Sequence, residues 1–381
     1  MNTAEGFYRN IIFKTVLFSF IIVIPSVRLF LKIDLLWLFP IYLLVVYFIF
    51  FNLKAINSSE ISKRMWWLVF ILLVAALSHF IYPVVSLRSN PGSTGDDAVR
   101  LSAQTLRNSA KLYDVEISST EPISPGPAWI LFNSPFVLFN LYWLFGAGYV
   151  AFAVGLLRRA VSTVFTNIFC LFMGLSMVFA ELLFNGHDLL PLSMAMFSVN
   201  LLIMYYLKKD VKWVSIILIS LFLGIVASSR IVFGFLPIMY FLLLKNDHRR
   251  NSYMLLIISS AVFILTNVYF FLVNDNFQPG HLIFKGITLL SLPIFLALVI
   301  IGIAAMFYLL SNDKRKSLSW NWTVFLVLSC PLIPLAYADL INSGYDFKYW
   351  EGANYLIIPL PFFILNLLND KQVMFLTANN S

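Results

Sequence analysis

The sequence predicts an all-α polytopic membrane protein with about twelve transmembrane helices and one long external loop. Hydrophobic residues make up 60% of the 381 residues, charged residues only 12%, and the mean hydropathy is +0.87. Soluble domains carry about 25% charged residues, so this chain lacks the polar side chains that a separate soluble catalytic domain would need. Twelve crossings of about 20 residues each would use about 240 positions, close to the apolar share of the chain.

Apolar segments follow one another along the whole chain. They span residues 11–31, 35–52, 65–87, 128–157, 161–183, 189–207, 213–229, 231–244, 252–273, 287–310, 321–341 and 354–369. The first three form an N-terminal group within residues 1–87, the loop 88–127 follows, and the other nine lie within 128–381. Each segment is predicted to cross the bilayer once.

Two places in this pattern are irregular. Segment 128–157 is long for one crossing and contains Pro135 and Asn140, so we expect it to begin as a helix on the membrane surface and then enter the bilayer. Segments 213–229 and 231–244 are short and meet at Arg230, which predicts either a tight external turn or a broken helix.

The distribution of charge supports this topology. If the N-terminus is cytoplasmic, 17 of the 26 basic residues but only six of the 18 acidic residues fall on the cytoplasmic side, as the positive-inside rule requires. The net charge of +8 is therefore attributed to membrane orientation rather than to nucleic-acid binding. Both termini are predicted to be cytoplasmic, and the loop 88–127 to be external.

The cysteines and histidines of the sequence indicate neither a disulfide nor a histidine-based metal site. Cys170 and Cys330 both lie in apolar segments, where cysteine packs as a small hydrophobic residue. The four histidines show no close pairing, which argues against a histidine-based metal centre. No cofactor is predicted with certainty, and dependence on a divalent metal is left open.

The external loop carries the candidate catalytic residues, Asp96 and Asp97. They follow Gly92 and Gly95 where a helix is expected to begin, and a carboxylate there is stabilised by free backbone N–H groups and the helix dipole. One interpretation is a helix cap on an exposed loop. The other is a functional acid pair, favoured by the length of this loop and by Pro122, which begins its proline-rich return to the membrane.

At these residues the chain resembles the GT-C superfamily of integral membrane glycosyltransferases, whose first long external loop carries an acidic motif followed by a helix. The similar elements here are Asp96-Asp97, then Arg100, Ala103 and Leu106, then Ser109 to Tyr113, then SPGPAWILFNSP. Further similar elements are FNGHDLLPL (184–192), SSRIVFGFLPIMYFLLL (228–244) and YWEGANYLIIPLPFFIL (349–365), with Asn354 where the family often has a basic residue.

This resemblance implies transfer of a sugar from a polyprenyl-phosphate-linked donor to a glycan, lipid or protein acceptor of the cell envelope. Asp96, supported by Asp97, would accept the proton of the acceptor hydroxyl, and positive charge would stabilise the departing phosphate. The candidate phosphate-binding residues are Arg230, His281, Lys285 and Lys348, and the candidate substrate-binding residues are Tyr113, His187, Asp188 and Glu351. We expect the bacterial inner membrane, with the active site on its external, periplasmic face.

Several of these residues also have structural interpretations. The alternative role of the lysines is to anchor the chain at the membrane surface, and that of Asp188 is to cap the helix that follows it. Glu181 and Asp339 near helix ends are expected to form hydrogen bonds between helices or to cap them. Arg230, between two apolar helices, is a functional candidate because charges at membrane depth are costly.

Two other functions are considered. An O-antigen-type polymerase also has about twelve helices, but its long loop tends to lie late in the chain and to carry arginines, whereas this loop is early and begins with acids. A lipid-linked glycan flippase or another transporter would commonly show two related halves, and residues 1–190 and 191–381 show no convincing repeat.

Overall fold

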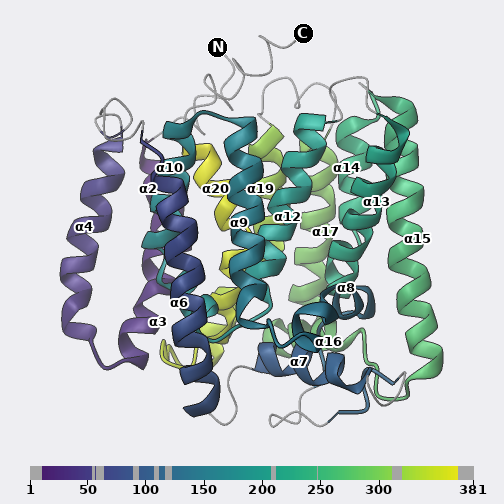
Figure 1. Cartoon of the computed structure of the whole chain (residues 1–381), viewed down its shortest axis with the longest axis horizontal. Coiled ribbons are helices and arrows are strands. Elements are labelled where there is room, and N and C mark those ends of the chain that lie inside the picture. The colour runs from purple at the N-terminus through teal and green to yellow at the C-terminus, as the bar shows by residue number, and fades with distance from the viewer. Residues whose placement is uncertain are drawn as a thin grey trace. The chain divides into compact units, whose positions relative to one another are not determined.

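The computed structural model describes residues 11–53, 56, 64–88, 94–106, 111–115, 122–206, 212–246, 248–310 and 320–367, and over these every regular element is a helix (Figure 1). Four helices are long and apolar enough to cross a membrane, or seven if each of three bent helix pairs counts as one crossing. This architecture fits a helical membrane protein that crosses the bilayer several times. The twelve crossings stay a prediction.

Some predicted features lie outside the described residues. They are parts of the external loop (89–93, 107–110 and 116–121), including Ser109 of the family motif, and the basic clusters at 208–209 and 314–316.

The chain divides into two units. Unit 1 comprises residues 1–73, 157–182 and 289–381, and unit 2 comprises 74–156 and 183–288. The helices of unit 1 are α2 (Ile11–Phe18), the π-helical η1 (Ser19–Val23), α3 (Ile24–Lys32), η2 (Leu36–Leu38), α4 (Phe39–Phe51), α10 (Thr163–Leu175), α17 (Leu292–Leu309), α19 (Trp320–Asn342), η5 (Glu351–Ile357) and α20 (Leu360–Leu367). The helices of unit 2 are α7 (Thr94–Thr105), α8 (Pro127–Leu138), α12 (Leu189–Tyr206), α13 (Trp213–Ser228), η4 (Ile231–Phe233), α14 (Leu236–Leu244) and α15 (Arg249–Val273). Four helices contribute residues to both units: α6 (Trp66–Arg88), α9 (Trp143–Ala160), α11 (Met177–Phe184) and α16 (His281–Leu290).

Three predicted segments are broken in the structure. The expected break in 128–157 is present, because α8 and α9 are bent by 115° with Asn140 at φ 58° between them. The single helix predicted at 161–183 is wrong, because α10 and α11 are bent by 74° at Ser176. Segment 287–310 is one helix, α17, from Leu292 onward, and its first residues belong to α16, which is bent by 113° from α17 at Ser291. Ser291 has φ 63°, a conformation that a right-handed helix cannot continue through.

In unit 1, α19 packs against η5 around Trp350. This fully buried side chain lies among Ala336, Leu340 and Leu356, and its Nε1 donates to Ala336 O at 2.6 Å. Asp339 Oδ2 accepts a hydrogen bond from Gly352 N at 2.7 Å. The expectation that Asp339 forms a hydrogen bond near the end of its helix is confirmed.

In unit 2, α13 packs along α15 (Figure 1). Gly224 makes this approach close, because a Cβ there would lie 2.8 Å from the backbone oxygen of Ser259 on α15. α8 contacts both of these helices and α7. Helix α8 thus connects α7 to the packed pair α13 and α15.

Large apolar side chains face outward on several helices. Leu44 and Phe48 on α4 are 74% and 69% exposed, and Leu272 on α15 is 75% exposed. Contiguous apolar surface of this kind is unfavourable in water and favourable in lipid, so these faces indicate a bilayer environment.

Candidate functional site

The acid pair of the loop 88–127 begins helix α7. Asp96 and Asp97 lie in its first turn, where four backbone N–H groups lack partners within the helix. Both side chains are buried, Asp96 completely. The predicted helix is therefore present, but the acids face the interior of unit 2 instead of capping an exposed loop.

The two carboxylates have different partners. Asp97 Oδ1 forms an ion pair with Arg100 Nη2 at 2.7 Å, one helical turn along α7. Asp96 Oδ2 accepts a hydrogen bond from Tyr82 Oη of α6 at 2.9 Å. A buried carboxylate without such partners would be strongly destabilising, so Tyr82 and Arg100 help to maintain both acids inside the protein.

Asp188 and Arg230 form a second buried pair in the same unit. Arg230 Nη2 lies 2.8 Å from Oδ1 and 2.9 Å from Oδ2 of Asp188, and its Nη1 donates to Ser229 O at 2.8 Å. Asp188 is fully buried and Arg230 is 2% exposed. Burial raises the pKa of Asp188, but the attraction of Arg230, aided by His187, outweighs it and leaves the pKa below its usual value.

Backbone geometry brings these charges together. Arg230 follows α13 in an extended conformation (φ −147°, ψ 138°), which interrupts the helix before η4. Asp188 lies directly before α12, after Gly186 with φ +69°. Along α15, Ser228 of α13 contacts Asn267, whereas Gly234 approaches Phe263 and Phe241 of α14 contacts Tyr253. The two helices therefore run in opposite directions, and the chain makes a tight turn at Arg230, one of the two arrangements that the sequence allowed.

Two side chains connect the acid pair with the Asp188–Arg230 pair. His187 Nδ1 lies 3.3 Å from Asp188 Oδ1, and a Cβ on Gly95 of α7 would lie 2.5 Å from the His187 ring. Tyr142 interacts electrostatically with both Asp96 and Asp188, and its Oη donates to Gly186 O at 3.1 Å. These contacts define the polar cluster of unit 2, which contains Tyr82, Asp96, Asp97, Arg100, Tyr142, His187, Asp188 and Arg230.

The loop segment that returns to the membrane closes against Arg230. Gly126 N donates to Ser229 O at 2.9 Å, and a Cβ on Gly126 would lie 1.7 Å from Ser228 O. Tyr113 Oη donates to Pro125 O at 2.9 Å. Burial raises the pKa of Tyr113 well above its usual value, although Arg230 partly offsets this.

Eight of the ten predicted site residues lie in unit 2. His281 Nε2 lies 2.8 Å from Ser124 Oγ, so α16 contacts the returning loop, and Lys285 lies one turn further along this helix. Lys348 and Glu351 lie in unit 1, where Lys348 Nζ is 3.8 Å from Asp34 Oδ1. The structure therefore brings together Asp96, Asp97, His187, Asp188, Arg230 and Tyr113, but it gives Lys348 a different neighbour.

Arg230 is less available to a ligand than the sequence suggested. Its Nη atoms contact Asp188 and Ser229, while its buried Nε has no hydrogen-bond partner among the described residues. The sequence did not identify Tyr82 and Tyr142 as members of the cluster. Both are tyrosines within or beside apolar segments rich in aromatic residues, so no local pattern distinguishes them.

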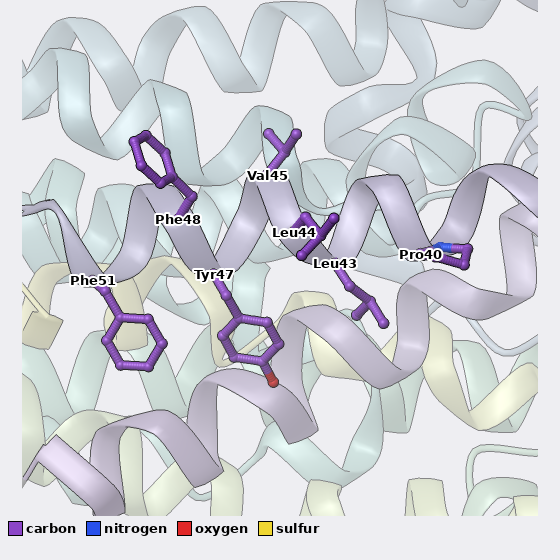
Figure 2. A pocket seen from close by; sticks show the side chains of 7 residues that line it. All are labelled: Pro40, Leu43, Leu44, Val45, Tyr47, Phe48 and Phe51. Carbon is purple, nitrogen blue, oxygen red and sulfur yellow. The ribbon is translucent and has the colours of Figure 1, made fainter.

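A pocket lies along α4 of unit 1 (Figure 2). Seven residues of this one helix line it: Pro40, Leu43, Leu44, Val45, Tyr47, Phe48 and Phe51. The lining contains no acid or base, so the pocket offers a surface for lipid chains rather than a reaction site. Among the described residues, no three His, Cys, Asp or Glu side chains form a group suited to a metal ion.

The fold and this cluster define the class of protein: a helical membrane protein with a buried acid–base cluster in one of its two units. Comparisons of the chain with protein-family models, with curated proteins and with solved structures found no match. The functional argument therefore depends on the residues of the cluster.

Proposed function

We propose that this protein is a membrane glycosyltransferase of GT-C type. It takes a sugar from a polyprenyl-phosphate-linked donor and transfers it to a glycan, lipid or protein acceptor of the cell envelope. The proposal includes twelve crossings, a location in the bacterial inner membrane and a reaction on its external face.

One observation carries this proposal: the acid pair of α7 lies in one buried cluster with His187, Asp188 and Arg230. Burying four charged side chains at the end of apolar helices costs stability, and charges kept in such a place are functional candidates for that reason. Glycosyl transfer from a lipid phosphate needs a proton acceptor and a positive charge close together. The cluster contains both.

The reaction assigns a role to each charge. Asp96 takes the proton as the acceptor oxygen forms its bond to the anomeric carbon of the sugar, while the bond from that carbon to the phosphate oxygen breaks. The polyprenyl phosphate leaves with the bonding electron pair, and cationic side chains stabilise its charge. Asp97, held by Arg100 at 2.7 Å, positions the start of α7 rather than accepting the proton.

Asp188 has a positioning role in this scheme. It aligns the Arg230 guanidinium through both carboxylate oxygens, at 2.8 and 2.9 Å. The Nε of Arg230, which has no partner in the described part of the chain, is a hydrogen-bond donor for an incoming phosphate oxygen. His281 and Lys285 of α16 are the additional candidates for the same phosphate in unit 2.

Mass spectrometry of cell-envelope glycans, with and without the gene for this chain, tests the activity first. A glycosyltransferase changes the glycan by the mass of one sugar, and purified protein with a lipid-linked sugar should restore that sugar. An O-antigen-type polymerase would instead change the number of whole repeats. A flippase would move lipid-linked glycan without forming a glycosidic bond, so an unchanged bond pattern in the reconstituted reaction would exclude the proposal.

A further inference from the structure

Unit 1 contains a separate charged cluster. Arg28 and Lys32 are four residues apart on α3, so their side chains share one face of the helix. Glu181 of α11 and Asn354 of η5 complete the group, which we call the Arg28 cluster. None of these four residues belongs to the polar cluster of unit 2.

Both cations contact the same oxygen of the same acid. Lys32 Nζ lies 2.7 Å and Arg28 Nη2 lies 3.4 Å from Glu181 Oε1. Arg28 Nη1 donates to Asn354 Oδ1 at 2.6 Å. The sequence expectation that Glu181 forms hydrogen bonds between helices is confirmed, but the contacts leave the charges unequal.

Two positive charges face one negative charge in this cluster. Among the residues that the structure describes, Glu181 is the one carboxylate within ion-pairing distance of Arg28 or Lys32. Arg28 is 5% exposed, and its Nε has no hydrogen-bond partner in the described part of the chain. Among the described residues, Glu181 Oε2 is also buried without a hydrogen-bond partner, so the cluster has one unsatisfied donor, one unsatisfied acceptor and one unbalanced positive charge. An unbalanced buried cation is unfavourable, and a bound anion would supply the missing negative charge and an acceptor for Arg28 Nε.

The cluster is reachable from the membrane surface. The Lys32 side chain is 35% exposed, while those of Arg28 and Glu181 are each 6% exposed. The chain leaves α3 at Ile33, which is 50% exposed, and continues to Trp37, which is 68% exposed. Exposed tryptophan beside apolar surface is typical of the headgroup region of a bilayer, so the opening lies where lipid headgroups are found.

We propose that the Arg28 cluster binds the phosphate of an anionic lipid headgroup. A guanidinium donates in parallel to phosphate oxygens and a lysine adds a mobile positive charge. None of its residues has a role in the proposed transfer reaction. Lipid binding to this cluster is measured without sugar donor or acceptor, so the two proposals can fail independently. Glu181 competes with the lipid phosphate for both cations.

Native mass spectrometry of the full-length protein in detergent, titrated with separate lipids, tests this site. The probes are phosphatidylglycerol, an isoprenyl monophosphate, inorganic phosphate and the uncharged diacylglycerol. We expect both phosphate lipids to bind and diacylglycerol not to bind. Preference for one of the two lipids identifies the source of the phosphate, whereas binding of inorganic phosphate alone would exclude a lipid site.

Removing a cation and removing the acid of this cluster should change lipid binding in opposite directions. Arg28→Gln should weaken phosphate-lipid binding by about 10-fold or more, because it removes a positive charge and its charge-assisted hydrogen bonds to the phosphate. Glu181→Gln should strengthen it, since the competing carboxylate is removed. Lys14→Gln, which removes a charge from α2 in the same predicted span, should leave binding unchanged.

Unchanged lipid binding in these variants would mean that Arg28, Lys32 and Glu181 form a structural ion-pair network that binds no lipid. If folded Glu181→Gln binds the lipid no more tightly than the wild type, or if Arg28→Gln binds equally well, the proposal is wrong. Thermal unfolding establishes that each variant is folded. If Arg28→Gln does not fold, Lys32→Gln at the exposed edge of the cluster replaces it. This variant should also bind the phosphate lipid more weakly than the wild type.

Discussion

Asp96 and Asp97 are neighbours in the chain, but different groups hold their carboxylates. Tyr82 donates a neutral hydrogen bond to Asp96, whereas Arg100 forms an ion pair with Asp97. Arg100 interacts electrostatically with both acids, but its hydrogen bond goes to Asp97 and fixes that carboxylate on its own helix. On the residue scale, therefore, Asp96 is the better candidate for accepting a proton.

Asp96→Asn should lower the rate of glycosyl transfer by about 10²–10⁴-fold, the usual contribution of a proton acceptor. Asp97→Asn should cost less, because it removes a positioning contact. Transfer is measured in membranes supplied with the lipid-linked sugar donor, after equal expression is established. If both variants retain wild-type transfer, the proton acceptor lies elsewhere.

Arg230 and Asp188 should stabilise the fold only as a pair. Arg230→Gln leaves a fully buried carboxylate without its counter-charge, and breaking a buried pair in this way costs about 3–5 kcal/mol. The double variant Asp188→Asn with Arg230→Gln should recover a large part of this loss. Thermal unfolding in detergent measures both, and a double variant no more stable than the single one would contradict the pairing.

The lowered pKa of Asp188 gives this pair a pH dependence. A carboxyl group whose pKa is lower in the folded protein contributes stability above its ordinary pKa of 3.8, and this contribution is lost as pH falls through the folded value. Unfolding by denaturant between pH 7 and pH 3 should show a loss of wild-type stability below about pH 4. The double variant should show a smaller loss over the same range.

At the scale of single helices, much could be predicted from sequence. The apolar segments lie where the helices lie, and Asp96 and Asp97 are in the first turn of α7 as their position after glycine indicated. The bends were harder to predict. Ser291 has φ 63°, a conformation that residues other than glycine adopt rarely, so the surrounding structure holds it there and the sequence does not indicate it.

Gly126 tests how the returning loop is attached. Its backbone is extended (φ −75°, ψ 160°), which alanine tolerates, so the effect of Gly126→Ala is purely steric. The added Cβ would lie 1.7 Å from Ser228 O, and displacement of the loop should cost about 1–3 kcal/mol. It should also lower transfer, because Ser229 beside it contacts Arg230.

Gly155→Ala in α9 is the matched control. A Cβ at Gly155 would meet no atom within 4 Å, and alanine favours a helix over glycine by about 0.5–1 kcal/mol. Thermal unfolding should therefore show an equal or higher midpoint for Gly155→Ala. Equal stability of the two variants would mean that the contact between Gly126 and Ser228 is not tight.

At the scale of the whole molecule, the site could be predicted only in part. Asp188 and Arg230 were both identified, but nothing in the sequence links two residues 42 positions apart, so their pairing was not foreseen. Tyr82 gave no signal, because tyrosine is common among the aromatic residues near helix ends. Charge and hydropathy predict where helices cross, while side-chain partners depend on tertiary packing.

The predicted topology places both termini in the cytoplasm and residues 88–127 outside, and it follows from the uneven distribution of basic residues along twelve segments. In a variant with Cys170 and Cys330 replaced by alanine, single cysteines can be introduced at Thr94, Ser118, Ser59 and Arg315. A membrane-impermeant thiol reagent should label positions 94 and 118 in intact cells and reach 59 and 315 only after permeabilisation. Labelling of position 59 from outside would contradict the count, because an odd number of crossings would then precede it. Since the acid pair of α7 lies only two residues beyond position 94, the same experiment establishes the face of the membrane on which an acceptor must approach Asp96.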